Sequence, residues 1–137
     1  MTHNVFAAIQ TNLKHHAERT LLTIPNGRQL TGSDLDRESA ILAGVLMRLG
    51  LEAGDRVSAQ IEKGWMNVVL YLAVLRSGAV YLPLNSAYTN SEIEYFVTDA
   101  ESKLHICSSD RAEHVESLRS QIPELQVLTL DHESGTL

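Results

Sequence analysis

The 137-residue chain has little cysteine and little positive charge. Its single cysteine, Cys107, cannot form an internal disulfide, so a reducing cytoplasm is the expected compartment. Lysine and arginine together number 11 against 17 aspartates and glutamates, which gives a formal net charge of −6 with neutral histidines. Because no run of basic residues occurs, binding to a nucleic-acid backbone has no electrostatic basis in this sequence.

Long hydrophobic runs and targeting signals are also missing. The longest apolar run lies within 68–75, ends before Arg76, and is far shorter than the roughly 20 residues that cross a bilayer. The N-terminal sequence MTHNVFAAIQ lacks the basic region and long apolar run of a secretory signal. Apolar residues at 44% and charged residues at 20% are typical of globular domains. We therefore expect one folded domain, or part of one, without a membrane span.

Motifs that carry chemistry are absent as well. The eight glycines match neither the dinucleotide-binding nor the Walker spacing, in which closely spaced backbone N–H groups hold phosphate. The histidines, including the adjacent His15 and His16, show no metal-ligand spacing with Cys107 or with carboxylates. Solvation is expected for that pair, and burial as a small hydrophobe for Cys107. We predict no catalytic, cofactor-binding or metal-binding residue in this chain, and its substrate-binding residues stay unknown.

Three aromatic residues and one lysine have structural explanations that outweigh functional ones. Trp65, Tyr71 and Tyr81 are expected to fill the core or the space between layers. Lys63 follows a predicted parallel strand, at the end of the strand where ligand crevices form. A solvated loop lysine is nevertheless the preferred interpretation.

Hydrophobic periodicity predicts helices and strands in the first part of the chain. Apolar residues at three- and four-residue spacing over 5–13 predict an amphipathic helix. Asn26-Gly27, between the strand-like segments 21–24 and 28–31, predicts a β-hairpin with a tight primed turn, since both residues tolerate positive φ. Thr31 and Asp34 predict a capping box for the next helix, whose leucine stripe ends at Gly50: Leu35, Leu42, Leu46 and Leu49.

The following segments predict βαβ units. A strand over 56–61, a helix over 64–77 and a strand over 79–82 imply parallel pairing with a right-handed crossover. The helix is apolar on most sides, so we expect it to lie between two layers.

The last third of the chain continues the alternation. The capping box formed by Thr89 and Glu92 opens a helix over 93–99, and Glu94 is expected to face solvent, which leaves no acid–base pair. Strands over 103–107 and 126–130 flank a helix over 112–121, and 132–137 is a trailing end. The fold class is therefore α/β: a β-hairpin followed by βαβ units of a mostly parallel, doubly wound sheet.

Three segments in this order resemble a known family. They are QLTGSDLD (29–36), GLEAGDRVSAQIEKG (50–64) and LRSGAVYLPLN (75–85), the last of which joins a helix to a strand through Gly78. Together they resemble the N-terminal region of adenylate-forming acyl-CoA synthetases, the AMP-binding enzymes that include adenylation domains. PLNSAYTNSEIEYFVTDAE (83–101) is most similar to malonyl-CoA synthetases. Gly32 stands where the family usually has an aromatic residue, and Gly64-Trp65 replaces a small or proline-containing helix start.

The resemblance implies a two-step acid–thiol ligase with malonate as the acid. ATP and the carboxylate form an acyl-adenylate and pyrophosphate, and the thiol of coenzyme A then displaces AMP. ATP, Mg²⁺ and coenzyme A would serve the parent enzyme, and none is expected to bind this chain. The family's phosphate-binding loop, magnesium-binding segment and mobile C-terminal domain lie downstream of position 137. We therefore expect 1–137 to be a partial AMP-binding domain that needs the rest of that domain and is inactive alone.

Two alternatives stay open. An adenylation domain that loads a carrier protein has the same N-terminal motifs, and only sequence beyond this region separates the two activities. A non-catalytic interaction module that retains the fold would behave as a monodisperse, cooperatively unfolding monomer. A fragment with an uncovered sheet edge would instead aggregate and bind hydrophobic dyes.

Overall fold

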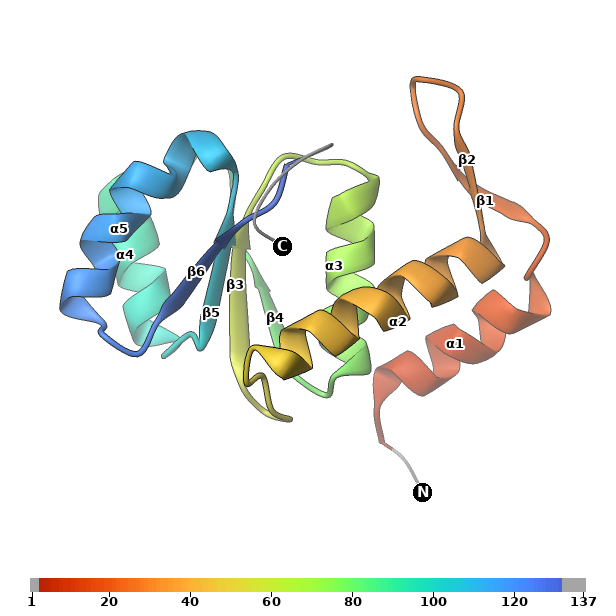
Figure 1. The fold of residues 1–137 in the computed structure, drawn as a ribbon, viewed down its shortest axis with the longest axis horizontal. Helices are drawn as coiled ribbons and strands as arrows, with labels where there is room; N and C mark the ends of the chain where they lie inside the picture. The colour runs from red at the N-terminus through yellow and green to blue at the C-terminus, as the bar shows by residue number, and fades with distance from the viewer. Residues whose placement is uncertain (1–2, 132–137) are drawn as a thin grey trace.

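A four-stranded parallel sheet separates two helical layers in the computed structural model, which describes residues 3–131 (Figure 1). The predicted trailing end, 132–137, lies outside the described residues. The sheet has the order β4-β3-β5-β6, with β3 and β5 at its centre. The strands are β3 (Arg56–Gln60), β4 (Val80–Pro83), β5 (Leu104–Cys107) and β6 (Gln126–Thr129).

Each parallel strand is joined to the next by a helix. α3 (Trp65–Arg76) connects β3 to β4, and α4 (Asn90–Asp99) connects β4 to β5. A 3-10 turn, η1 (Ser109–Arg111), and α5 (Ala112–Gln121) connect β5 to β6. α2 and α3 lie on one face of the sheet, and α4 and α5 on the other (Figure 1). The predicted α/β, doubly wound fold is confirmed, with observed helix and strand bounds within three residues of the expected ones.

The N-terminal part of the chain builds outward from the first helical layer. α1 (Val5–His15) packs against α2 (Gly32–Arg48). The segment that connects these two helices forms the antiparallel strands β1 (Thr20–Thr23) and β2 (Gln29–Thr31), a separate two-stranded sheet. The hairpin projects away from the body of the molecule (Figure 1). Capping fixes where the later helices begin: Thr31 accepts from the Asp34 N–H at 3.1 Å, and Thr89 with Glu92 repeats the predicted capping box.

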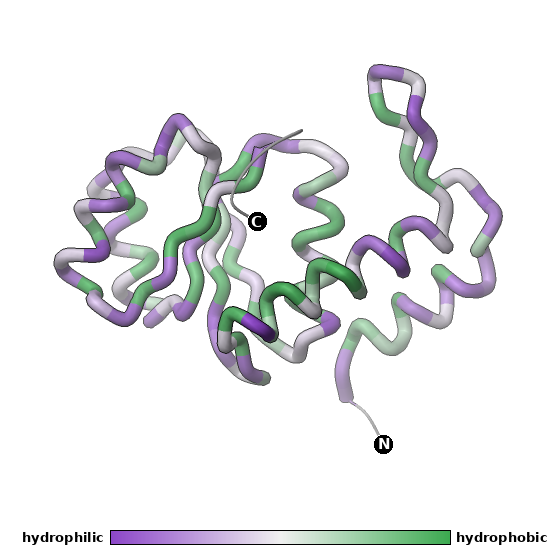
Figure 2. The backbone as a smooth tube through the Cα atoms, in the orientation of Figure 1, coloured by the Kyte–Doolittle hydropathy of each residue, from purple (hydrophilic) through white to green (hydrophobic). Residues whose placement is uncertain are grey.

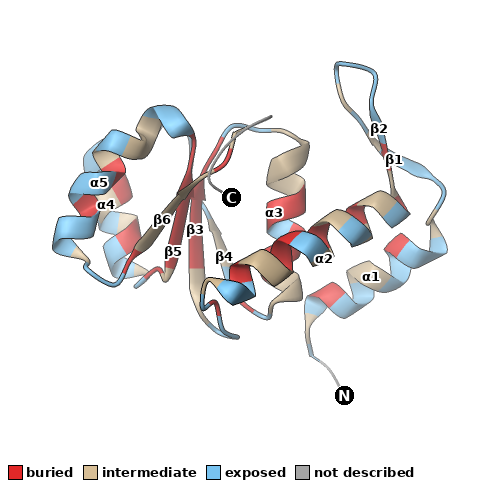
Figure 3. Cartoon of the chain, viewed as in Figure 1, coloured by how far each residue is buried: buried red, intermediate tan, exposed pale blue. Residues whose placement is uncertain are grey.

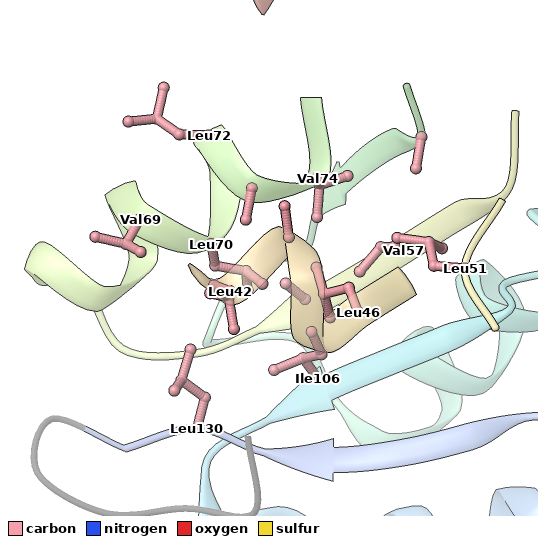
Figure 4. Packing of buried hydrophobic residues seen from close by; sticks show 14 of the residues in the cluster. Leu42, Leu46, Leu51, Val57, Val69, Leu70, Leu72, Val74, Ile106 and Leu130 are labelled. Carbon is pink, nitrogen blue, oxygen red and sulfur yellow. The ribbon is translucent and has the colours of Figure 1, made fainter. Parts of the chain in front are cut away.

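Two hydrophobic clusters form the core, one on each face of the sheet. The larger one joins side chains of α2 and α3 to the strands, including Leu46, Leu70, Val57 and Ile106 (Figure 4). The smaller one lies under α4 and α5. Hydrophobic and polar residues alternate along the central strands (Figure 2), and the same strands are almost entirely buried (Figure 3). Each fully buried leucine contributes about 1.5–3 kcal/mol to folding, so these clusters specify the layer order.

Gly32 explains one departure from the family pattern. A Cβ atom at this position would lie 2.5 Å from the Leu13 carbonyl oxygen and 2.6 Å from the His16 carbonyl oxygen. The end of α1 therefore approaches the first turn of α2 so closely that no side chain fits. An aromatic residue here would require α1 to move.

The hairpin is confirmed, but the predicted primed turn is wrong. Among the described residues other than glycine only Glu101 has a positive φ, so Asn26 does not adopt the left-handed conformation, whereas Gly27 does with φ 92°. The Gly27 N–H donates to the Ile24 carbonyl at 2.8 Å, which places Pro25 and Asn26 at the centre of the turn. Pro25 is confined to negative φ, so the turn starts at the proline and leaves the positive φ to glycine.

α3 is less enclosed than its composition predicts. One side packs on α2, α1 and the sheet, where Val69, Leu70, Ala73 and Val74 are buried. On its other side Trp65 and Val68 are only half-buried and Tyr71 is 42% exposed, so the expectation of a core position for Tyr71 is wrong. Gly78 ends the helix at φ 74°, as the predicted helix-to-strand join requires. The helix is covered by one layer and open on the opposite side.

Candidate ligand crevice at the carboxyl edge of the sheet

The order of the strands defines where a crevice should lie. From β3 the chain passes through α3 to β4 on one side, then returns through α4 to β5 on the other side of β3. The connections therefore reverse direction between β3 and β5. In open α/β sheets, ligands bind outside the carboxyl ends of the strands at this point.

At the reversal point itself the space is almost filled. A cavity of about 60 Å³ lies there, which has room for one or two water molecules and not for a nucleotide. Asp131, two residues after the end of β6, lies at the edge of the cavity, where its carboxylate accepts a hydrogen bond from the Ser109 N–H at 3.0 Å. The residues around the cavity are Ile61, Glu62, Gly64, Met66, Asn67, Ser108, Leu130 and Asp131.

A larger cavity lies next to it, between the hairpin and the start of α3. Its volume is about 680 Å³, within the usual size of small-molecule sites. Arg28 from the hairpin places its guanidinium carbon 4.9 Å from the centre of the Trp65 ring. Lys63, at the carboxyl end of β3, is exposed and contributes to the cavity wall, as does Val68. Lys63 is thus a solvated loop residue, as expected, and also lies at the crevice that its sequence position suggested.

A shallow groove continues along the open side of α3 to the edge strand β4. Val68 lines both spaces, and the groove of about 490 Å³ also contacts Asn67, Tyr71, Tyr81 and Pro83. The Tyr81 hydroxyl donates to Asn67 Oδ1 at 2.9 Å, and burial raises the pKa of Tyr81 to about 12. Tyr81 is therefore a partly buried, uncharged hydrogen-bond donor that fixes the wall of this groove, consistent with its predicted role between layers.

The opposite face of the sheet carries buried polar side chains that sequence reasoning missed. Ser58 on β3 and His105 on β5 are paired in register, and their side chains share a hydrogen bond of 2.8 Å. Gln60 lies on the same face and donates to the carbonyls of Asn85 and Tyr88, which holds the loop after β4. The sequence did contain a signal for them: Ser58 and Gln60 are polar residues two positions apart in a predicted strand, so they lie on the same face of the sheet.

Burial decides what the Ser58–His105 pair can do. Both side chains have no exposed surface, and burial, with a smaller effect of His114, lowers the pKa of His105 to about 4. A serine beside a neutral histidine has the composition of an activated nucleophile. Because the pair has no exposed surface, a substrate cannot reach it, and its hydrogen bond joins β3 to β5 inside the sheet.

Cys107 is buried as the sequence suggested, whereas of the adjacent histidines, both expected to be solvated, His15 is exposed and His16 is half-buried. Cys107 is completely buried, and burial together with Asp110 raises the pKa of its thiol to about 11, so it is a protonated, small hydrophobic residue. His15 and His16 lie edge to face with ring centroids 4.9 Å apart at the end of α1. Within 3–131, no three histidine, cysteine, aspartate or glutamate side chains form a group that could hold a metal ion.

The fold and its crevice define an α/β domain of the class that binds ligands beyond the carboxyl ends of its strands. The chain belongs to the AMP-binding enzyme family, whose model matches residues 9–136. Across the described residues, no helix combines the length and apolar content needed to span a bilayer.

Solved structures support the same assignment. Apo MatB from Rhodopseudomonas palustris is 36% identical, with a TM-score of 0.90, over 99% of this chain and 27% of the MatB chain. ATP-bound MatB from the same organism matches with a TM-score of 0.85 at the same identity and coverage. The resemblance to this group of enzymes is therefore confirmed in both sequence and fold.

Curated relatives include two kinds of enzyme. The medium-chain fatty-acid–CoA ligase of Escherichia coli (strain K12) is 30% identical over 107 residues, which is 74% of this chain and 19% of the ligase. Nonribosomal peptide synthetase 4 of Gibberella zeae is 32% identical over 95 residues, which is 69% of this chain and 1% of the synthetase. The chain thus spans between 1% and 27% of the length of these relatives.

Proposed function

We propose that this chain is the N-terminal structural part of an ATP-dependent acid–CoA ligase. The main observation that supports this proposal is the structural match to MatB, which covers 99% of this chain but only 27% of the MatB chain. In this proposal residues 1–137 supply two helical layers, the four-stranded sheet between them and the hairpin. The remaining polypeptide of the AMP-binding domain and the small domain supply the chemistry. The chain alone does not adenylate a carboxylate.

The residues present do not fit a nucleotide site of their own. The glycines lack phosphate-loop spacing, and the cavity at the strand reversal has only about 60 Å³. ATP, Mg²⁺ and coenzyme A are therefore proposed for the whole enzyme, and no described residue is assigned to any of them. A cytoplasmic location belongs to the same proposal, since Cys107 is a buried free thiol.

Malonate is the proposed acid. Its support is the similarity of 83–101 to malonyl-CoA synthetases, together with the 36% identity to MatB over 99% of the chain. Expression of the complete reading frame, followed by assay of AMP release with malonate, methylmalonate, acetate and octanoate, tests this directly. Preference for octanoate or acetate over malonate would contradict the choice of acid while leaving the ligase class intact.

A segment exchange tests the structural proposal. The matching N-terminal segment of R. palustris MatB would be replaced by residues 1–137, and malonyl-CoA formation measured. An active chimera is the expected result, because the fold and layer contacts are shared. The 137-residue chain alone, with ATP, Mg²⁺, malonate and coenzyme A, should release no AMP. Robust release would refute the proposal that the catalytic residues lie in the rest of the enzyme.

Loading of a carrier protein is a second candidate, favoured by the similarity to the Gibberella synthetase over 69% of the chain. The two candidates differ in the acceptor of the acyl group and not in the adenylation step. The complete protein, offered coenzyme A and a phosphopantetheinylated carrier protein in parallel, distinguishes them. Acylation of the carrier alone would replace the CoA-ligase proposal.

A further inference from the structure

The cavity between the hairpin and α3 has an unbalanced charge. Arg28 and Lys63 contribute cationic side chains to its wall, and none of the residues that line it carries a carboxylate. The remainder of the wall is apolar or uncharged: Leu22, Thr23, Ile24, Pro25, Asn26, Gly64, Trp65 and Val68. In a chain with net charge −6, an acid-free wall with two cations favours an anionic occupant.

The two cations have spare hydrogen-bonding capacity. Several other arginines of the described segment are engaged, for example Arg76 with Asp36 at 2.7 Å and Arg37 with Asp34 at 2.9 Å. The Arg28 guanidinium, by contrast, contacts the Trp65 ring and has no ion-pair or hydrogen-bond partner among residues 3–131. A guanidinium stacked on an indole is held in position while its N–H donors stay available for an oxyanion.

We propose that this cavity binds an organic oxyanion, a carboxylate or phosphate carried on an aromatic or apolar body. The oxyanion accepts hydrogen bonds from Arg28 and is attracted by Lys63, while its body packs on Trp65, Val68 and Ile24. The volume of about 680 Å³ accommodates such a molecule. The site is separate from the ligase chemistry proposed above and does not depend on it.

Trp65 is the only tryptophan of the chain, so its fluorescence reports on this cavity directly. The probes are phenyl phosphate and benzoate, which share a ring and differ in the anion, with benzyl alcohol as the uncharged control. Titration at constant ionic strength should give a saturable change for at least one anion, with Kd roughly millimolar for molecules of this size. Saturation by phenyl phosphate alone identifies a phosphate site, and by benzoate alone a carboxylate site.

Matched variants separate the site from general charge effects. Arg28→Gln and Lys63→Gln remove a cation from the wall and should weaken binding, the arginine variant by about tenfold, because a charged hydrogen bond is lost. Arg48→Gln makes the same charge change on an exposed residue outside the cavity and should leave binding unchanged. Circular dichroism verifies that each variant is folded.

Three results would overturn the proposal. One is the absence of a saturable change with either anion, and another is equal binding of benzyl alcohol. The third is sedimentation showing that the protein associates through this face, with a Trp65 signal that follows protein concentration instead of ligand concentration. In that case a second polypeptide, not a small anion, covers the cavity.

Discussion

Ser58 and His105 lie opposite each other on β3 and β5, with Ser58 Oγ 2.8 Å from His105 Nδ1 and neither side chain exposed. The imidazole Nε2 is also buried, and it has no hydrogen-bond partner among the described residues. A cationic imidazole would have to give up its hydration at this position. The neutral ring is therefore the form that the folded layers accommodate.

The first prediction concerns pH. The pKa of His105 falls from 6.5 to about 4 on folding, so between these values the unfolded chain binds more protons than the folded one. The neutral His105 side chain therefore contributes to the unfolding free energy in full above pH 6.5. This contribution is lost as the pH falls from 6.5 towards 4, by about 3 kcal/mol in total. Urea unfolding at pH 7, 5.5 and 4 measures the loss.

A separate measurement must show that His105 causes this pH dependence of the unfolding free energy. The imidazole Cε1–H resonance of His105 should not titrate above pH 5. The variant His105→Gln should flatten the pH dependence of the unfolding free energy. Titration of His105 near pH 6.5 would contradict the prediction without any mutation.

The second prediction tests the hydrogen bond through two serines of similar burial. Ser58→Ala removes the partner of His105 Nδ1 and leaves a buried polar atom unpaired, which should cost about 1–3 kcal/mol of unfolding free energy. Ser102 is also buried, at 6% exposure, but its hydroxyl has no partner within the described segment. Ser102→Ala should therefore be neutral or slightly stabilising. Equal losses in the two variants would show that the Ser58 bond contributes nothing specific.

The third prediction uses two glycines of α2. Gly32→Ala would force a Cβ atom within 2.6 Å of two carbonyl oxygens, so it should destabilise the protein by about 1–3 kcal/mol. Gly44 lies inside the same helix, and the nearest atom to an added Cβ is an Arg48 nitrogen at 3.9 Å. Gly44→Ala should stabilise by up to about 1 kcal/mol, because alanine favours a helix interior. Thermal unfolding of both variants should therefore show shifts of opposite sign.

The sequence predicted the boundaries of helices and strands better than it predicted which of their faces are buried. The capping boxes at Thr31 and Thr89 and the glycine at position 78 are local signals, and each marks a boundary found in the structure. Composition indicated that α3 is apolar on most sides, but whether another layer covers its outer face depends on contacts that no local pattern specifies. Tyr71 is exposed for this reason.

The candidate site was less predictable than the fold. Lys63 could be placed near a crevice because it follows a strand, but Arg28 belongs to a hairpin whose position over Trp65 is set by tertiary packing. The primed-turn prediction failed because Asn26-Gly27 was read without Pro25, whose ring shifts the turn by one residue. Pairing of Ser58 with His105 required the strand register, which periodicity alone does not give.

The fourth prediction concerns the contact that joins three helices. Arg76 at the end of α3 donates to Asp36 Oδ1 of α2 at 2.7 Å, and its guanidinium lies 4.8 Å from the centre of the Phe6 ring of α1. Although burial acts to raise the pKa of Asp36, the hydrogen bonds from Arg76 and Gln10 hold it below its ordinary value. Arg76→Lys keeps the charge but loses the planar contact with both partners, and should cost about 1–2 kcal/mol.

Arg37 provides the comparison for Arg76. It pairs with Asp34 at 2.9 Å on the same helix, but its side chain is 55% exposed against 25% for Arg76. Arg37→Lys should leave the unfolding free energy nearly unchanged, because exposed pairs contribute little. Chemical unfolding of both variants in low and high salt measures the difference. If the two substitutions have the same cost, charge alone holds these helices together, and the stacking of Arg76 on Phe6 is not part of what fixes α1 to the domain.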